Sequence, residues 1–390
     1  MQREPHRIFG LDLLRTTAVL LVIFHHSLDY IHPSQWICSF GTLGSLGVEF
    51  LLVLTGYLVG QSVLKKMSQG RFAVRQLGTF YFRRWMRTLP PYYFFLLMMA
   101  ALTPAFFAAL WYHMEYFLFL QNVAWSVPPF YSQTWTLAVQ EFFYILCPLF
   151  LLAGSRLFRR RLVAFLAPVS ILLLVPLALR AFHTHVEDSL GFDQVFRKWV
   201  IFRFDSPVIG VILAFIEIEL PGVWAWIRRH SWLGLSLILL MAAYAIMDFP
   251  YLYSSHWLQV FFFPVVSVCV ALVFPYLCGW KESPGHIGMI VSSISNMTYT
   301  IYVSHFVAFY FAFALLLIYP IDSILLTGAV YFSMVWLVAY PSYLLIEAPL
   351  LSLRRDDSSR ESYLVQSYRK LSASWSSLLE SIRPTPALAK

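Results

Sequence analysis

Residues 10–30 read GLDLLRTTAVLLVIFHHSLDY, an apolar stretch long enough to cross a membrane that nevertheless contains Arg15 and His26. An eleven-residue step is about three helical turns plus roughly 20°, so both side chains project from the same face of a helix. Their rise along the axis is on the order of 16 Å. Because ionisable groups are costly in lipid, we predict a membrane helix that carries two functional residues.

Composition indicates the class of protein. The chain has 390 residues, of which 59% are hydrophobic and 12% charged, with a mean hydropathy of +0.67. These values exclude an ordinary soluble domain. The net charge of +8 does not indicate nucleic-acid binding, because nearly all Lys and Arg fall in connections on one side of the predicted helices. We predict an all-α, polytopic membrane helical bundle with no nucleic-acid partner.

The connections at residues 65–87 and 155–161 are rich in Lys and Arg, which places them and both termini in the cytoplasm. The loop at 181–199 is the exception on the opposite side, since it holds Arg197 and Lys198. About ten transmembrane helices are predicted, near residues 9–29, 46–64, 89–110, 136–154, 162–180, 200–220, 231–248, 257–280, 295–318 and 323–346.

The chain divides into a transmembrane domain at residues 1–353 and a cytoplasmic tail at 354–390. Apolar residues of the tail recur every three or four positions, which predicts an amphipathic helix on the membrane surface before a disordered end. No small-residue cleavage site follows the first apolar stretch, so we interpret it as a retained helix rather than a signal peptide. The four cysteines lack metal-binding or CxxC spacing, so neither a disulfide framework nor a metal site is expected.

His26 is the leading candidate for chemistry, because an imidazole that titrates near neutral pH can take a proton from a hydroxyl. The alternative is a histidine that reaches the outer interface, with Asp29 one turn beyond it. Arg15 cannot act as a base, and its functional role would be to hold an anion or polarise a carbonyl. Its ordinary explanation is a pair with Asp12.

Two further groups of polar residues adjoin apolar segments. Arg84 and Arg87 share a helical face and could bind phosphates, although any cytoplasmic helix boundary attracts Arg. Four ionisable residues within or beside predicted spans need a partner or a role, and they are Glu49, Glu141, His305 and Glu347. One such residue alone is usually structural, whereas several that converge between helices indicate a site.

These motifs together resemble the acyltransferase-3 family of integral membrane acyltransferases, from residue 8 to about residue 353. Each motif is weak alone, but six in the family's order are strong. The motifs are LDLLRTTAVLLVIFHH with Arg15 and His26, GVEFLLVLTGYLV with Glu49, Arg84 and Arg87 before a proline, WTLAVQEFFYILCPLF with Glu141, SNMTYTIYVSHFV with Tyr302 and His305, and IEAPL with Glu347.

The resemblance implies transfer of an acyl group, commonly acetyl, from acyl-CoA to a hydroxyl of a carbohydrate, glycolipid or other small acceptor. It implies no bound cofactor and a bacterial plasma (inner) membrane. By the resemblance, the catalytic residues are His26, Arg15 and Glu141, and the donor-binding residues are Arg84 and Arg87. The possible supporting residues are Asp12, Glu49, Gln140, Tyr302, His305 and Glu347.

Gln140 is a departure, because the family usually has a carboxylate at this position, and a glutamine cannot exchange a proton. Some relatives carry a fused SGNH hydrolase-like domain, for which the segment after residue 353 is too short. We therefore expect any transfer to be completed in the membrane domain. His26 would act as a general base on the acceptor or would carry the acyl group itself, and the sequence does not choose between these roles.

Three other functions stay open from the sequence. A proton-coupled exporter or flippase would use the same buried ionisable residues as a relay. A glycosyltransferase that uses polyprenyl-phosphate sugars ranks low, because the first outer loop offers no acidic pair. A non-catalytic relative would bind acyl-CoA without transferring the acyl group. Gln140 leaves this alternative open, because it stands where the family usually has a carboxylate.

Overall fold

The computed structural model describes residues 8–31, 39–70, 72–103, 110–183, 186, 189–248, 255–282 and 285–352. Within these ranges the chain is almost entirely helical and contains no β-strand, which confirms the predicted all-α class. The amphipathic helix predicted in the tail and the N-terminal basic residues lie outside the described part.

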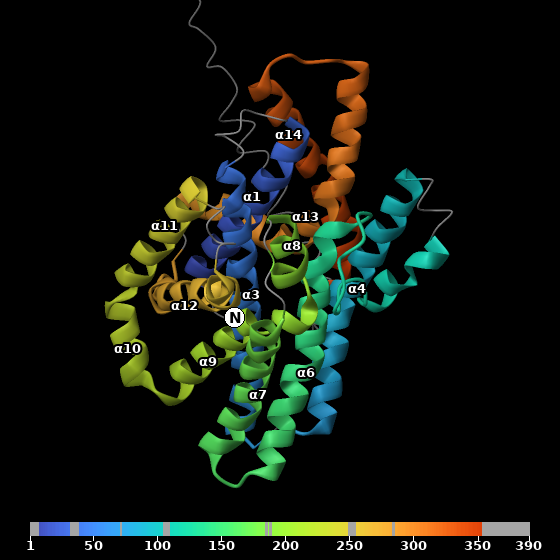
Figure 1. Ribbon diagram of the computed structural model, residues 1–390. Coiled ribbons are helices and arrows are strands. Elements are labelled where there is room, and N and C mark those ends of the chain that lie inside the picture. The colour runs from blue at the N-terminus through green and yellow to red at the C-terminus, as the bar shows by residue number, and fades with distance from the viewer. Residues whose placement is uncertain are drawn as a thin grey trace, which may run out of the picture.

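The helices form a bundle in which α6 and α7 run side by side as an antiparallel pair (Figure 1). The long helices are α1 (Phe9–Ile31), α3 (Leu43–Ser68), α4 (Val74–Leu102), α6 (Trp135–Leu157), α7 (Arg161–Phe182), α9 (Asp205–Glu219), α11 (Ser231–Asp248), α12 (His256–Gly279), α13 (Gly285–Ile318) and α14 (Ile324–Ser342). The short elements are η1 (Phe40–Thr42), η2 (Leu110–Leu118), η3 (Ser132–Thr134), α8 (Ser189–Phe192), η4 (Asp193–Arg197), η5 (Val200–Phe202), α10 (Pro221–Arg229), η7 (Tyr343–Glu347) and α15 (Ala348–Ser352).

Each of the ten predicted segments corresponds to one long helix, but some predicted boundaries are wrong. In the described residues, 7 helices are long and apolar enough to cross a membrane, or up to 8 if one bent pair is a single span. The helix predicted at 89–110 instead begins at Val74, so its arginines and Pro90 lie inside α4. Apolar character marks only the lipid-facing length of a helix, whereas backbone hydrogen bonding continues beyond it.

The bent pair consists of α9 and α10, whose axes differ by 115°. Leu220 separates them with φ −129° and ψ 60°, which is not a helical conformation. Pro221 follows as the first residue of α10, and a proline disfavours helical backbone at the preceding position. The predicted segment at 200–220 therefore ends in a sharp turn rather than continuing straight.

Close packing of α3 against α9 depends on two glycines. A Cβ atom added to Gly56 would lie 1.7 Å from the carbonyl oxygen of Pro207, and one added to Gly210 would lie 2.1 Å from that of Val53. Small residues let two membrane helices approach until their backbones touch. This contact holds Glu49 of α3 and Asp205 of α9 near each other in the interior.

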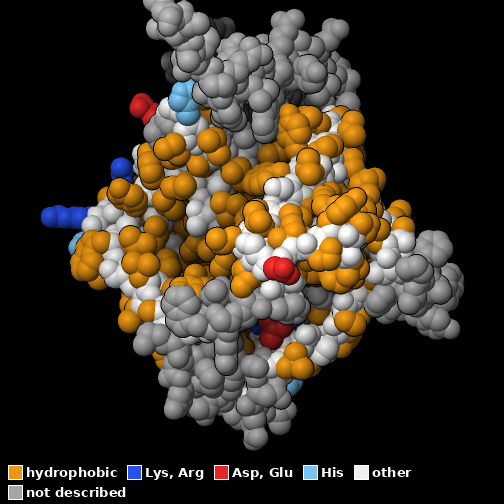
Figure 2. All heavy atoms as spheres, turned by 90° about the horizontal axis from the view of Figure 1, so that it is seen from above, with side chains coloured by type: hydrophobic (Ala, Val, Ile, Leu, Met, Phe, Trp, Pro, Cys, Tyr) orange, Lys and Arg blue, Asp and Glu red, His pale blue; other side chains and the backbone are white. Residues whose placement is uncertain are grey.

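The surface supports a membrane location for the bundle. Figure 2 shows hydrophobic side chains over most of the described part of one face. Large apolar residues on several long helices are exposed, including Leu174 on α7, Leu240 on α11 and Leu337 on α14. A water-facing surface rarely exposes apolar patches of this extent. The chain is a multi-pass membrane protein.

Candidate functional site

A cavity of about 680 Å³ lies beside the C-terminal half of α1. Its wall includes residues from α1, α3, α6, α12 and α13, together with the segment from α8 to Lys198. Three residues that the sequence analysis selected line it, namely His26, Glu49 and Tyr302. The cavity therefore brings together residues far apart in the sequence.

His26 lies in this wall with its side chain 20% exposed. Its ring stacks on the His305 ring of α13, with centroids 5.3 Å apart and planes 30° apart, and meets the Phe306 ring edge-on. The Nδ1 atom of His26 is 3.6 Å from the Oδ2 atom of Asp29. This distance is too long for a hydrogen bond, and Nδ1 of His26 has no hydrogen-bond partner among the described residues.

His305 is fully buried behind His26. Its Nδ1 atom is 2.6 Å from the carbonyl oxygen of Tyr302, to which only a protonated Nδ1 can donate. Its Nε2 atom has no hydrogen-bond partner among the described residues. The Tyr302 hydroxyl in turn donates to the carbonyl oxygen of Gln133, 2.9 Å away, and contacts the Thr136 hydroxyl. These contacts join α13 to the start of α6 around the cavity.

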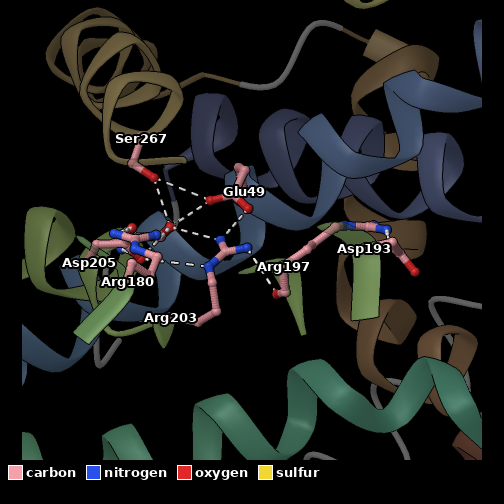
Figure 3. A network of polar contacts seen from close by, with 8 residues as sticks. Glu49, Arg180, Asp193, Arg197, Arg203, Asp205 and Ser267 are labelled. Carbon is pink, nitrogen blue, oxygen red and sulfur yellow. Dashed lines mark hydrogen bonds and ion pairs between the residues drawn. The ribbon is translucent and has the colours of Figure 1, made fainter. Parts of the chain in front are cut away.

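Behind the wall lies a buried ionic network, which reaches the cavity through Glu49 (Figure 3). Glu49 accepts hydrogen bonds from the Arg203 guanidinium, from the Ser206 hydroxyl at 2.6 Å and from the Ser267 hydroxyl at 3.2 Å. Arg203 has no exposed surface and also lies over the Phe263 ring, 4.0 Å from its centroid. The hydrogen bonds and the opposite charge compensate for burying the carboxylate.

Asp205 extends this network to a second buried arginine. Its Oδ2 atom accepts a hydrogen bond from Nη2 of Arg180 at 2.8 Å, and its Oδ1 atom is 3.6 Å from Nε of Arg203. With Glu49, the network holds two carboxylates and two guanidinium groups, so its formal charges cancel. Arg180, Arg203 and Asp205 were not among the candidate residues predicted from the sequence, although all three are charged residues within or beside apolar segments.

Three further charged residues, Asp193, Arg197 and Lys198, line the cavity. We call them the cationic trio, because their formal charges sum to +1. Asp193 accepts a hydrogen bond from Nη1 of Arg197 at 2.6 Å and pairs with the Lys198 ammonium through its other oxygen. Burial raises the pKa of Asp193, but the two cations outweigh it and lower the pKa to about 2. Burial lowers the pKa of Lys198, while Asp193 opposes that shift. Asp193 is therefore ionised at neutral pH.

Arg84 and Glu141 lie in a different cluster, between α4 and α6. The Arg84 guanidinium lies over the Tyr144 ring, 3.7 Å from its centroid. Tyr144 donates a hydrogen bond to Oε1 of Gln140 at 3.1 Å, and Trp85 donates to Oε2 of Glu141 at 3.2 Å. Neither Gln140 nor Glu141 lines the cavity beside His26. Gln140, where the family usually has a carboxylate, is therefore connected to Arg84 through Tyr144 and not to His26.

Arg87 lies one turn further along α4 and contacts the other end of the chain. Its Nε atom donates to Oε1 of Glu347 at 3.4 Å, and the Thr300 hydroxyl donates to Oε2 at 2.5 Å. Glu347 is fully buried at the end of η7, a π-helical turn of a type often found at functional sites. The two arginines thus diverge, Arg84 toward α6 and Arg87 toward η7.

Arg15 and Asp12 form a third location. The Nη1 atom of Arg15 is 3.5 Å from Oδ1 of Asp12, which also accepts a hydrogen bond from the Ser295 hydroxyl of α13 at 2.6 Å. The structure therefore places the predicted residues in three locations, with Arg15 and Asp12 apart from the cavity beside His26. The roles predicted for Arg15 and Glu141 remain predictions.

This geometry has the components of a group-transfer site in a membrane. An imidazole lines a large cavity with aromatic and polar walls, and two arginines of α4, Arg84 and Arg87, lie apart from it with different contacts. The family model described as an acyltransferase domain matches residues 8–343. The chain belongs to the acyltransferase-3 family, which confirms the resemblance.

Among curated proteins, the chain is similar to O-acetyltransferase OatA of two Staphylococcus aureus strains, NCTC 8325 / PS 47 and COL. Each is 26% identical over 230 residues, a match that covers 55% of this chain and 35% of the relative. The match thus covers about a third of the length of these relatives. No solved structure gives a significant match.

Proposed function

We propose that this chain is a membrane-embedded O-acyltransferase that moves an acetyl group from acetyl-CoA to a hydroxyl of a carbohydrate or glycolipid. The observation that carries the proposal is the His26 imidazole in the wall of a cavity of about 680 Å³. Family membership and the O-acetyltransferase names of the relatives support the reaction type. A bacterial plasma membrane is the proposed location.

In this scheme His26 removes the proton from the acceptor hydroxyl as its oxygen attacks the thioester carbonyl carbon. The carbon–sulfur bond then breaks, the acetyl group stays on the acceptor oxygen, and the CoA thiolate leaves with the proton from His26. In the alternative route His26 carries the acetyl group between the two substrates. Asp29, 3.6 Å from Nδ1, would stabilise the imidazolium in the first route.

The donor would bind at the Arg84 end of the bundle. Arg84 and Arg87 supply two guanidinium groups for the phosphates of CoA. Arg15, between the two ends of α1, would hold the pantetheine arm or polarise the thioester carbonyl. Glu141, which contacts Trp85 beside Arg84, would act on this donor end rather than on His26.

The test measures transfer from radiolabelled acetyl-CoA to a cell-envelope extract by the purified protein in nanodiscs. We expect labelled acceptor with the wild type and none with His26→Ala. His286→Ala is the control, because His286 is an exposed histidine at the start of α13 that does not line this cavity. Full transfer by a folded His26→Ala protein would refute the scheme.

Two other results would favour the rival functions. Saturable acetyl-CoA binding without transfer by the wild type would indicate a non-catalytic relative. Absence of acetyl-CoA binding would instead favour a proton-coupled exporter or flippase.

A further inference from the structure

The cationic trio is unexpected where it lies. Its loop is the exception to the charge bias that sets topology, because Arg197 and Lys198 belong to the side whose other loops carry few cations. Both side chains are only 13% exposed, and both line the cavity that contains His26. Burying two cations on this side disfavours folding and topology, which indicates a role in binding.

We propose that Arg197 and Lys198 form an anion subsite for the acceptor, so that the acylated molecule carries a carboxylate or phosphate near its reactive hydroxyl. This inference rests on the proposed function and names the chemical class of its acceptor. The trio has two cations for one carboxylate, and Asp193 occupies only part of their hydrogen-bonding capacity. One positive charge therefore faces the cavity uncompensated within the trio.

The other charged residues of the cavity wall do not neutralise the net positive charge of the cationic trio. Glu49 is 2% exposed and is neutralised by Arg203 behind it. Asp29 has a side chain that is 65% exposed, and its carboxylate opposes the shift of the Lys198 pKa less than that of Asp193 does. The cavity thus has a base at one position and a net cation at another, which suits an acceptor whose hydroxyl and anionic group reach both.

The backbone that carries the two cations is held by side chains from other elements. Arg203 donates from Nη1 to the carbonyl oxygen of Arg197 at 3.1 Å. Asn122 donates to the carbonyl oxygen of Lys198, and its own carbonyl accepts from the Val200 amide at 2.9 Å. A subsite fixed before its ligand arrives loses less conformational entropy on binding. This arrangement resembles a prepared site more than a solvated surface loop.

The test measures binding without turnover, by calorimetric titration of the purified full chain in phosphatidylcholine nanodiscs. D-glucuronic acid and D-glucose 6-phosphate are the anionic probes, and D-glucose is the neutral match. We expect both anionic sugars to bind at least tenfold more tightly than glucose to the wild type. Lys198→Gln should remove most of this preference, and Lys198→Arg should preserve it.

The Asp193→Asn variant distinguishes an anion-binding role of the cationic trio from a purely structural role in holding the loop. If the trio binds an anion, removing its carboxylate frees two cations, and anionic probes should bind more tightly than to the wild type. If the trio only holds the loop, Asp193→Asn and Lys198→Gln should weaken all three probes alike. That result, or equal wild-type affinity for charged and neutral sugars, would overturn the inference.

A second arm identifies the source of the anion. In nanodiscs that contain phosphatidic acid, competition that depends on Lys198 would assign the subsite to a lipid-borne phosphate, whereas unchanged sugar binding would assign it to a soluble acceptor. Because no transfer is needed, the two proposals fail separately. Anion binding without acetyl transfer refutes only the proposed function, and acetyl transfer without anion preference refutes only the subsite.

Discussion

The two charged ends of this bundle are built from similar residues but differ in what those residues face. At the His26 end, the imidazole and the cationic trio line a cavity of about 680 Å³. At the Arg84 end, each arginine is in contact with protein, Arg84 with the Tyr144 ring and Arg87 with Glu347, and neither lines that cavity. A ligand can enter the cavity at the His26 end directly. At the Arg84 end, a ligand must first displace the protein groups that the two arginines contact.

Because of this difference, ligand binding should depend on residues of the two ends in different ways. A ligand in an open cavity gains its contacts without breaking existing ones, so loss of a cavity residue removes catalysis or binding directly. A phosphate at the Arg84 end must compete with a buried carboxylate for the same guanidinium, which lowers the net gain. We therefore expect substitutions at the two ends to change different kinetic constants.

The largest expected effect is that of His26→Gln. Loss of the base should lower kcat for acetyl transfer by about 10²–10⁴-fold, the usual contribution of general base catalysis. The KM for acetyl-CoA should stay unchanged, because the proposed site for the donor phosphates is at the other end. The measurement is a steady-state assay with varied acetyl-CoA. A rise in KM with kcat preserved would reverse the assignment of the two ends.

Arg203→Met tests whether the wall of the open cavity depends on the buried network. The substitution leaves Glu49 buried without its cation, and breaking a buried pair in this way costs about 3–5 kcal/mol. We expect a clear fall in the midpoint of thermal unfolding, followed by tryptophan fluorescence in detergent. The double variant Glu49→Gln/Arg203→Met should recover part of the loss. An unchanged midpoint for Arg203→Met would show that the pair contributes little.

Arg87→Met tests the closed end. Loss of one charge-assisted hydrogen bond to a donor phosphate should weaken acetyl-CoA binding by about 1.5–3 kcal/mol, or roughly 10–150-fold, with kcat at saturation little changed. Glu347→Gln is the matched control, since it frees Arg87 from its carboxylate and should tighten binding. Equilibrium titration of acetyl-CoA measures both. Equal affinities in all three proteins would exclude Arg87 from the donor site.

The sequence predicted the fold class and one segment for each long helix, because membrane helices are marked by their apolar length, but it placed the start of α4 wrongly. It also selected His26 and His305, because ionisable residues are rare in such segments, while Tyr302 came from the family resemblance, and these three residues do meet at one place. It did not predict that Glu141 would lie away from His26. Pairing between helices depends on how they rotate and cross, and one helical sequence does not specify its neighbours.

The buried network and the cationic trio were missed for a related reason. Arg180, Arg203 and Asp205 lie within or at the ends of predicted apolar segments, where charged residues often reach the interface. Only the folded chain shows that they are fully buried and paired with each other. For the trio, the sequence did give a signal, since Arg197 and Lys198 opposed the charge bias of the other loops.

Gln140→Glu should have the smallest effect and bears on the same comparison. Gln140 accepts a hydrogen bond from Tyr144, which lies under Arg84, so a carboxylate there should alter only the donor end. We expect the KM for acetyl-CoA to change by less than about threefold, in line with a few tenths of a kcal/mol for a partly exposed charge, and the pH dependence of kcat to stay unchanged. A pH–rate profile of both proteins measures this. A shifted profile would mean that position 140 acts on His26 across the bundle, and the separation of the two ends would then be wrong.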